Sequence, residues 1–245
     1  MRRPSGPPEA RTGAPGPLER STAHAKAARS VRLAIFDLDG TITRHGTLGP
    51  YVVGLLIRRP WQLLRLALAV PALAGFLLGR LDQGELKARL LSVTLRGRTR
   101  RELESWTRRF VPRVLARAVR ADALLAIEAH RRDGDRLVLL SASPDLYVPE
   151  IAAGLGFDAA ISTGILWNGD RLDGRLATPN RRGLEKTRCI EELARRHPGA
   201  RIAAYANAAS DLDHLARVDE PLLVCASRAA RRRAAQAGIP TARWK

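Results

Sequence analysis

Residues 31–43 read VRLAIFDLDGTIT and decide which fold the sequence favours. Residues 33–36 are apolar and run directly into two aspartates, Asp37 and Asp39. An apolar run of this length, bounded by charge and glycine, is typical of a buried parallel strand in an α/β sheet. Such sheets bind ligands at the carboxyl ends of their strands, so both carboxylates are expected at the binding edge. There, one carboxylate could attack as a nucleophile while the other moves a proton.

The pentapeptide DLDGT at residues 37–41 resembles the nucleophile motif of the haloacid dehalogenase (HAD) superfamily of phosphohydrolases. An Asx-type turn would explain the Asp-Gly pair alone, but not a second aspartate directly at the end of the strand. The resemblance implies an α/β fold with a Rossmann-like core around a parallel sheet. It also implies that three partner motifs follow in a fixed order along the chain.

The composition is that of a globular protein with an unusual charge. The chain has 245 residues, enough for one good core and a smaller unit, and 45% of them are hydrophobic. A net charge of +18 would attract nucleic acid, anionic lipid or anionic metabolites, but arginine is spread along the whole chain and selects no single partner. The isolated cysteines, Cys189 and Cys225, indicate a reducing compartment and no disulfide. Residues 1–30, rich in Pro, Gly, Ala and Arg, are predicted to form a disordered basic tail.

Residues 48–81 form the most apolar part of the chain. Between Trp61 and Gly79 only two residues are polar, so the run approaches the length of a membrane span. Three interpretations are open. We expect first a buried helix pair in a cap domain, and second an Arg-flanked surface that dips into a lipid interface. The third, a bilayer-spanning helix, is disfavoured by Arg65 and Pro71 within the run.

Amphipathic helices are predicted after this run. Apolar side chains recur there at helical spacing, and Thr99 with Glu102 resembles a capping box. We therefore predict an all-helical cap over residues 46–115, inserted after the first strand. This is the position of the cap in the phosphoserine-phosphatase-like branch (subfamily IB) of the superfamily. Residues 31–45 and 116–245 are predicted to form the two parts of the HAD core.

A second strand is predicted over residues 136–140, followed by the sequence SASP. A hydroxyl at a strand end, together with free backbone N–H groups, suits the non-bridging oxygens of a phosphoryl group. Pro144 and the residue after it are expected to open a helix, whose N-terminus would add further N–H groups. By the resemblance, Ser141 is the phosphate-binding hydroxyl, and Ala142 and Thr41 also bind the substrate.

Later elements complete the predicted core. Asn168-Gly169 between apolar runs predicts a β-hairpin. Strands are expected over residues 201–206 and 222–225, and a helix over residues 228–237 follows them. The consecutive arginines of that helix are interpreted as a solvated face, with a phosphate- or lipid-facing patch as the alternative.

Lys186 lies at the start of a predicted helix over residues 185–196. The chain has only four lysines, so a lysine at this position is less readily explained as ordinary surface charge. A lysine that faces the site would neutralise the attacking aspartate and bind phosphoryl oxygens as a point charge. By the resemblance, Lys186 is the third motif of the superfamily.

The fourth motif departs from the pattern of the superfamily, which is Gly-Asp-x-x-x-Asp. Here Ala206 and Asn207 take the first two positions, and only Asp211 keeps its carboxylate. Mg²⁺ prefers oxygen ligands, and an amide oxygen can replace a carboxylate at some loss of affinity. The resemblance thus implies a Mg²⁺ site made by Asp37, the backbone carbonyl of Asp39, Asn207 and Asp211, with weaker metal binding because of the amide at position 207.

The implied reaction is hydrolysis of a phosphomonoester in two steps. Asp37 attacks phosphorus to form an aspartyl-phosphate, while Asp39 protonates the leaving oxygen and later activates water. Ser141 and Lys186 hold the phosphoryl group.

Two features of the sequence bear on the substrate class. Phosphoserine phosphatases place a glutamate nine residues after the nucleophile, where this chain has Gly46, so phosphoserine is disfavoured. The Arg-Arg-Pro segment before the apolar run is similar to the cap of bacterial type C phosphatidylglycerophosphate phosphatases, which implies a lipid headgroup phosphate. A soluble small phosphomonoester is the alternative, and a catalytically weak lipid- or partner-binding module is another.

The predicted location is the cytoplasm, with peripheral contact at the anionic inner face of the cell membrane as an open possibility. Nucleic acid is disfavoured as a partner, because aromatic residues make up only 4% and no recognition motif is visible.

Overall fold

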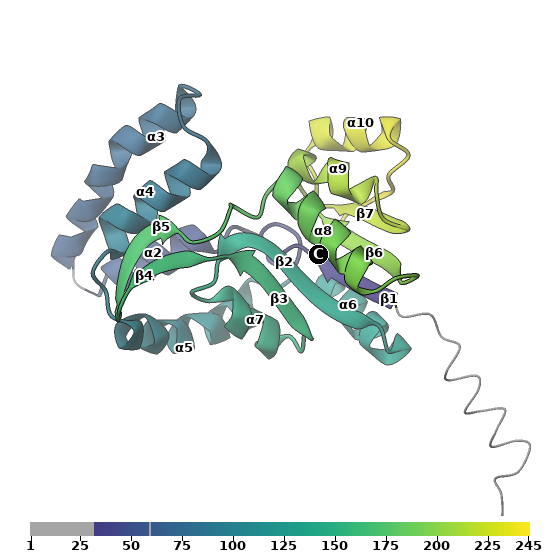
Figure 1. Cartoon of the computed structure of the whole chain (residues 1–245), viewed down its shortest axis with the longest axis horizontal. Coiled ribbons are helices and arrows are strands. Elements are labelled where there is room, and N and C mark those ends of the chain that lie inside the picture. Colours follow the sequence, from purple (N-terminus) through teal and green to yellow (C-terminus); the bar gives the residue numbers. More distant parts are fainter. Residues whose placement is uncertain (1–31, 59) are drawn as a thin grey trace, which may run out of the picture. The chain divides into compact units, whose positions relative to one another are not determined.

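The computed structural model describes residues 32–58 and 60–245, and the predicted basic tail at residues 1–30 lies outside this range. Within the described residues, six parallel strands form one sheet in the order β3-β2-β1-β6-β7-β8 (Figure 1). Strands β4 and β5 form a separate antiparallel pair. The fold is therefore α/β around a parallel sheet, which confirms the predicted fold class.

The strands of the large sheet are β1 (Arg32–Phe36), β2 (Arg136–Pro144), β3 (Ala159–Thr163), β6 (Arg201–Ala206), β7 (Glu220–Val224) and β8 (Thr241–Ala242), and those of the hairpin are β4 (Ile165–Asn168) and β5 (Arg171–Leu176). The α-helices are α2 (Leu48–Leu56), α3 (Val70–Leu77), α4 (Gln83–Leu95), α5 (Arg100–Arg117), α6 (Ala121–Asp133), α7 (Val148–Gly154), α8 (Leu184–Arg196), α9 (Leu212–Leu215) and α10 (Arg228–Gln236). Two segments, η1 (Pro60–Ala69) and η2 (Ala209–Asp211), are 3₁₀ helices.

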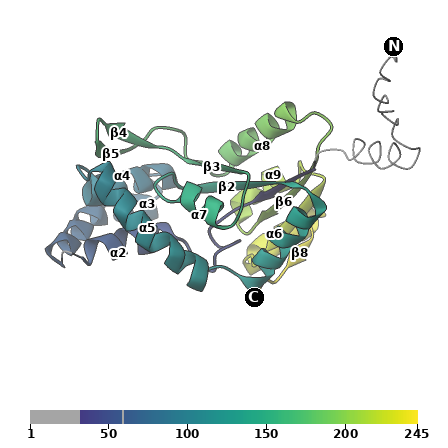
Figure 2. The same cartoon turned by 90° about the horizontal axis from the view of Figure 1, so that it is seen from below.

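The sheet is buried on both faces, as the apolar run of the first strand predicts. Alternate residues of β1 enter different cores: Ala34 and Phe36 pack with α6 and α7, whereas Leu33 and Ile35 pack with α8, α9 and α10. Figure 2 shows α8 and α6 on opposite sides of the sheet. A strand with two buried faces needs apolar residues at every position rather than at alternate ones.

The strand order brings the carboxyl ends of three strands together. From β1 the chain continues to β2 and β3 on one side, and later crosses to β6 and β7 on the other. Open α/β sheets bind ligands at such a reversal of strand order. Asp37 and Asn207 directly follow β1 and β6, and Ser141 lies in the last part of β2.

The predicted helix start at Pro144 is wrong. Pro144 still pairs with Thr163 of β3, and the N–H of Asp145 donates to the carbonyl of Thr163 (3.0 Å). The chain therefore stays extended, and α7 begins only at Val148, with Pro149 in its first turn. The predicted strand over residues 201–206 and the hairpin at Asn168-Gly169 are confirmed.

We use the term helical insertion for residues 48–117, which hold α2, η1, α3, α4 and α5 between β1 and α6. The predicted capping box of Thr99 and Glu102 begins α5, and the pair Asp82 and Glu85 caps α4 in the same way. The backbone of the loop before α5 pairs with the hairpin, since the N–H of Leu172 donates to the carbonyl of Arg98 (2.8 Å). These hydrogen bonds tie the helical insertion to β5.

The expectation that the apolar run forms a buried helix pair is wrong. Residues 60–77 form η1 and α3, in which Trp61, Leu64 and Leu77 are 66%, 75% and 74% exposed. Nothing among the described residues covers these side chains. Within the described part of the chain, no helix combines the length and apolarity needed to cross a membrane.

Acid should destabilise the fold through His214, which is buried in α9 with no partner for Nδ1 among the described residues. Burial, assisted by the charge of Lys186, lowers its pKa to about 3. The unfolded pKa is about 6.5, so the contribution of neutral His214 to stability is present above pH 6.5 and is lost as the pH falls below it. We expect the free energy of unfolding of the wild type to fall between pH 7 and pH 5 by about 2 kcal/mol more than that of His214→Gln. Denaturant unfolding in the presence of EDTA measures both values. An equal loss in both proteins would contradict this assignment.

Candidate active site

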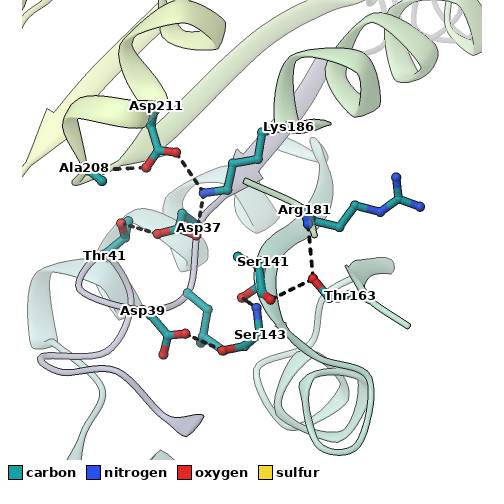
Figure 3. A network of polar contacts seen from close by, with 12 residues as sticks. Asp37, Asp39, Thr41, Ser141, Ser143, Thr163, Arg181, Lys186, Ala208 and Asp211 are labelled. Atoms are coloured by element: carbon teal, nitrogen blue, oxygen red, sulfur yellow. Dashed lines mark hydrogen bonds and ion pairs between the residues drawn. The ribbon is translucent and has the colours of Figure 1, made fainter. Parts of the chain in front are cut away.

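Asp37 lies directly after β1 at the carboxyl edge of the sheet. Its N–H donates to the carbonyl of Tyr205 in β6 (2.9 Å), which fixes the residue at the end of the strand. Its carboxylate accepts hydrogen bonds from Lys186 Nζ (2.7 Å to Oδ1) and Thr41 Oγ1 (3.1 Å to Oδ2), as Figure 3 shows. Asp37 and both donors are buried. A carboxylate held in one orientation opposite a cation is well placed to act as a nucleophile.

Lys186 reaches Asp37 from the first turn of α8. Its Nζ also lies 3.3 Å from Oδ1 of Asp211, so one ammonium group contacts two carboxylates. Burial alone would lower the pKa of Lys186, but the charges of Asp37 and Asp211 outweigh burial and raise it. Lys186 is therefore a fixed positive charge beside Asp37, where incoming phosphoryl oxygens would be stabilised.

Asp39 is held by hydroxyl groups from two other segments. Thr47 donates to Oδ1 of Asp39 through its N–H (2.7 Å) and its hydroxyl (2.8 Å), and Ser143 Oγ donates to Oδ2. The hydroxyl of Tyr147 lies 3.0 Å from Thr47 Oγ1 and 3.2 Å from Ser143 Oγ. Burial raises the pKa of Asp39, and these donors oppose the rise only in part. A fixed carboxyl group with a raised pKa has the properties of a proton donor.

The part of β2 that carries Ser141 and Ala142 departs from regular strand pairing. The β2–β3 ladder is irregular between Leu140 and Pro144, as at a bulge, which re-aims the intervening residues. Ser141 is fully buried, and its Oγ accepts the N–H of Ser143 (3.0 Å). Among the described residues its hydroxyl donates to no protein acceptor, so the O–H is available to a ligand. The carbonyl of Ala142 accepts from Thr163 Oγ1 (2.7 Å) and from Lys87 Nζ.

Asn207 and Asp211 bring further oxygens to this edge. Asn207 packs against Gly40, where an added Cβ would lie 2.0 Å from Asn207 Nδ2 and where φ is +85°. Asp211 is buried, and its Oδ2 accepts the N–H of Ala208 (3.3 Å). With the carboxylate of Asp37 and the carbonyl of Asp39, these residues are the predicted ligands of Mg²⁺, which prefers oxygen donors. Only two of them are carboxylates, and no three Asp, Glu, His or Cys residues gather as a metal cluster within the described ranges.

The sequence matches the family model of the haloacid dehalogenase-like hydrolases over residues 34–216, a range that includes all eight predicted site residues. The chain belongs to the haloacid dehalogenase-like hydrolases. It is also 33% identical over 190 residues to Protein CicA of Caulobacter vibrioides, and the match covers 77% of this chain and 83% of CicA. The predicted superfamily is thereby confirmed, and the protein is a hydrolase.

Solved structures share the fold of this HAD hydrolase. A protein of unknown function from Bordetella pertussis Tohama I is similar with a TM-score of 0.73 at 21% identity, over 86% of this chain and 98% of that one. A phospho-aspartyl intermediate analogue of phosphoserine phosphatase is similar with a TM-score of 0.59 at 17% identity, over 83% and 91%. At these identities the likeness shows the fold alone, so the roles of single residues stay predictions.

Two residues that support the HAD site, Thr47 just before the helical insertion and Lys87 within it, were not predicted from the sequence. Thr47 is the N-cap of α2, but its hydroxyl caps no helix N–H and instead binds Asp39. Lys87 of α4 reaches the carbonyl of Ala142 at the edge of the site. The scarcity of lysine that singled out Lys186 applies equally to Lys87 and could have identified it. The contact between Thr47 and Asp39 could not be predicted in this way, because a threonine just before a helix is usually an N-cap.

Replacing Lys87 with Met should lower kcat/KM about tenfold, the effect of losing a charged hydrogen bond. Lys87 Nζ donates to the carbonyl of Ala142 and to Asn180 Oδ1, so the change frees the end of β2, which carries the predicted phosphate-binding hydroxyl of Ser141. Burial lowers the pKa of Lys87 to about 8, so wild-type kcat/KM should also fall as the pH rises through that value. The variant should lack this fall. Arg89→Met, on the same helix but exposed, is the control, and equal effects of both changes would refute the role.

Replacing Asn207 with Asp should tighten Mg²⁺ binding about tenfold or more, because a carboxylate restores the charge that the fourth motif normally has. Isothermal titration calorimetry measures this directly, without turnover. Asn168→Asp, the same change in the exposed hairpin turn, is the matched control for added negative charge. An unchanged titration in Asn207→Asp would show that residue 207 does not contact the metal.

Proposed function

We propose that the protein is a Mg²⁺-dependent phosphomonoester hydrolase that works through an aspartyl-phosphate. The observation that carries the proposal is the buried carboxylate of Asp37, oriented by Thr41 and paired with Lys186 at 2.7 Å. The match to the HAD hydrolases and the likeness in fold to a phospho-aspartyl analogue of phosphoserine phosphatase support it.

The proposed reaction has two steps, transfer of the phosphoryl group to Asp37 and hydrolysis of the resulting aspartyl-phosphate. In the first, an Asp37 oxygen bonds to phosphorus, the bond to the ester oxygen breaks, and Asp39 gives its proton to that leaving oxygen. In the second, Asp39 takes a proton from a water molecule whose oxygen bonds to phosphorus, and the bond to Asp37 breaks. Lys186 and the hydroxyl of Ser141 stabilise the phosphoryl oxygens in both steps.

The residues that would hold Mg²⁺ are Asp37, the carbonyl of Asp39, Asn207 and Asp211. When bound, Mg²⁺ supplies positive charge that offsets the charge developing on the phosphoryl group. Lys186 already supplies part of that charge through its contacts with both carboxylates.

For the substrate, we propose a lipid headgroup phosphate, such as that of phosphatidylglycerophosphate. Gly46, in the position of the glutamate of phosphoserine phosphatases, has no side chain, and no described atom beyond its two chain neighbours lies within 4 Å of the point where one would begin, so this position offers no carboxylate to bind an amine. The exposed apolar side chains of η1 and α3 suit a substrate embedded in lipid. A soluble phosphomonoester is the second candidate, favoured by the likeness in fold to phosphoserine phosphatase.

Phosphate release tests both parts of the proposal. Phosphatidylglycerophosphate in mixed micelles is compared with phosphoserine and an aryl phosphate, each with Mg²⁺ or EDTA, with Asp37→Asn as the control. Release from the lipid that needs Mg²⁺ and Asp37 supports the proposal. Release from soluble esters alone overturns the lipid substrate. No release from any of them would favour a binding module, with Asn207 as the departure that weakens catalysis.

A further inference from the structure

A basic cavity of about 470 Å³ lies in the helical insertion, between the end of α2 and the start of α5. None of its lining residues contacts Asp37, Asp39 or Lys186 through the hydrogen bonds and ion pairs described above. Its charged and aromatic lining consists of Arg58, Arg98, Arg101, Glu102, Trp106 and Arg109. Four arginines thus face one glutamate.

The arginines of this cavity differ in how they are held. Arg98 is buried, donates to Gln62 and lies 3.7 Å from Glu102. The guanidinium of Arg58 lies over the ring of Trp106, 5.8 Å from its centre. Arg101 and Arg109 are exposed, and neither has a hydrogen-bond or ion-pair partner among the residues that the structure describes. Arg101 and Arg109 are therefore open to an anion, and a guanidinium group can bind phosphate oxygens through paired hydrogen bonds.

An exposed apolar stripe begins beside this cavity. We call it the apolar face, and it consists of Trp61, Leu64, Leu68, Val70, Leu73, Leu77 and Leu78, each between 48% and 75% exposed. The hydrogen bond from Arg98 to Gln62 links the cavity to the start of η1. Large apolar side chains exposed together along one segment of a protein usually mark an interaction site. Exposed arginines, Arg65 and Arg80, lie within and just after the stripe.

We propose that the cavity binds the phosphate of an anionic lipid headgroup while the apolar face enters the interface of the same bilayer. The surface of an anionic membrane has two layers, negatively charged headgroups and the acyl chains beneath them. Arg101 and Arg109 suit the headgroups, and the neighbouring apolar face suits the acyl boundary. A soluble anion would use the cavity but would leave the apolar face uncovered. This docking goes beyond the proposed function, because it needs no turnover and would hold for any substrate.

Vesicle co-sedimentation of the full chain carrying Asp37→Asn tests the docking without hydrolysis. Vesicles of phosphatidylcholine alone are compared with vesicles that also contain phosphatidylglycerol. We expect at least tenfold tighter binding to the anionic vesicles. Adding Arg101→Gln and Arg109→Gln should weaken that binding about tenfold, and Leu64→Gln with Leu77→Gln should weaken it similarly.

A matched control separates the cavity from net charge. Arg232→Gln with Arg233→Gln removes the same charge from exposed positions of α10, and every variant keeps the basic residues 1–30. Equal weakening by the α10 pair and the cavity pair would overturn the proposal, as would equal binding to both kinds of vesicle. So would binding of glycerol phosphate at the cavity by a protein that does not bind vesicles.

Failure of the membrane docking can be distinguished from failure of the proposed phosphatase activity. With Asp37 intact, the cavity variants should release phosphate from a soluble aryl ester at the wild-type rate, which also shows that they fold. Vesicle binding without phosphate release would leave the docking standing and refute the proposed chemistry. Phosphate release without vesicle binding would refute the docking alone.

Discussion

Replacing Asp37 with Asn is expected to reduce phosphate release by about 10⁴-fold or more, the scale for loss of a nucleophile. The amide has no anionic oxygen to form the bond to phosphorus, although it keeps the shape of the side chain. Lys186 loses one of its two carboxylate partners but still contacts Asp211, so the buried ammonium remains paired. Steady-state release from an aryl phosphate measures the effect.

The Asp37→Asn protein should keep its fold, which circular dichroism and thermal unfolding would check. A loss of activity accompanied by unfolding would leave the role of Asp37 open, so Asp213→Asn, at an exposed position of α9, serves as a control for loss of an acidic group. A folded Asp37→Asn protein with near wild-type activity would refute Asp37 as the nucleophile.

Replacing Asp39 with Asn should have the second-largest effect, a loss of about 10²- to 10⁴-fold in kcat, the range for a positioned acid or base. The amide oxygen can still accept from the donors that hold Asp39, but no carboxyl proton remains for the leaving oxygen. An aryl phosphate with a good leaving group needs little protonation, so its first step should survive better than that of an alkyl phosphate. Water activation would still fail.

Rapid-quench kinetics separates these two steps. With a good aryl leaving group, Asp39→Asn should release about one equivalent of the phenol quickly and then stall, because the second step lacks its base. Thr47→Val, which removes one donor to Asp39, should reduce kcat by a smaller factor. Equal losses for aryl and alkyl esters without a burst would contradict the proton-transfer role of Asp39.

The central strand and the residues at its end were predictable from the sequence. Ala34 and Phe36 enter one core and Leu33 and Ile35 the other, so the unbroken apolar run carried the signal for a doubly buried strand. Lys186 was predictable for a different reason, namely the rarity of lysine in an arginine-rich chain.

The surroundings of Asp39 were not predictable, because they depend on tertiary packing. Thr47 and Ser143 are 96 residues apart in the sequence, and only the fold brings their hydroxyl groups to the same carboxylate. Tyr147, buried against both, has no sequence pattern that links it to Asp39. Pro144 does not start a helix, because the chain is still paired with β3 at this residue, and a proline starts a helix only where the chain leaves the sheet.

The exposure of the apolar run in η1 and α3 could not be predicted from its hydropathy. The same composition would suit a buried helix pair, an interfacial surface or a membrane span, and only the observed exposure of Trp61 and Leu64 excludes burial. Periodicity could not decide, because a run that is apolar on every side has no preferred face.

The most direct test of the proposed chemistry is to trap the phosphoryl group on the enzyme. Wild-type protein is mixed with a ³²P-labelled phosphomonoester and Mg²⁺, quenched with acid within a single turnover, digested and mapped by mass spectrometry. We predict an acid-stable, base-labile label on the peptide that contains Asp37, and none in Asp37→Asn. Phosphate release without any label, or a label on another residue, would contradict an aspartyl-phosphate at Asp37.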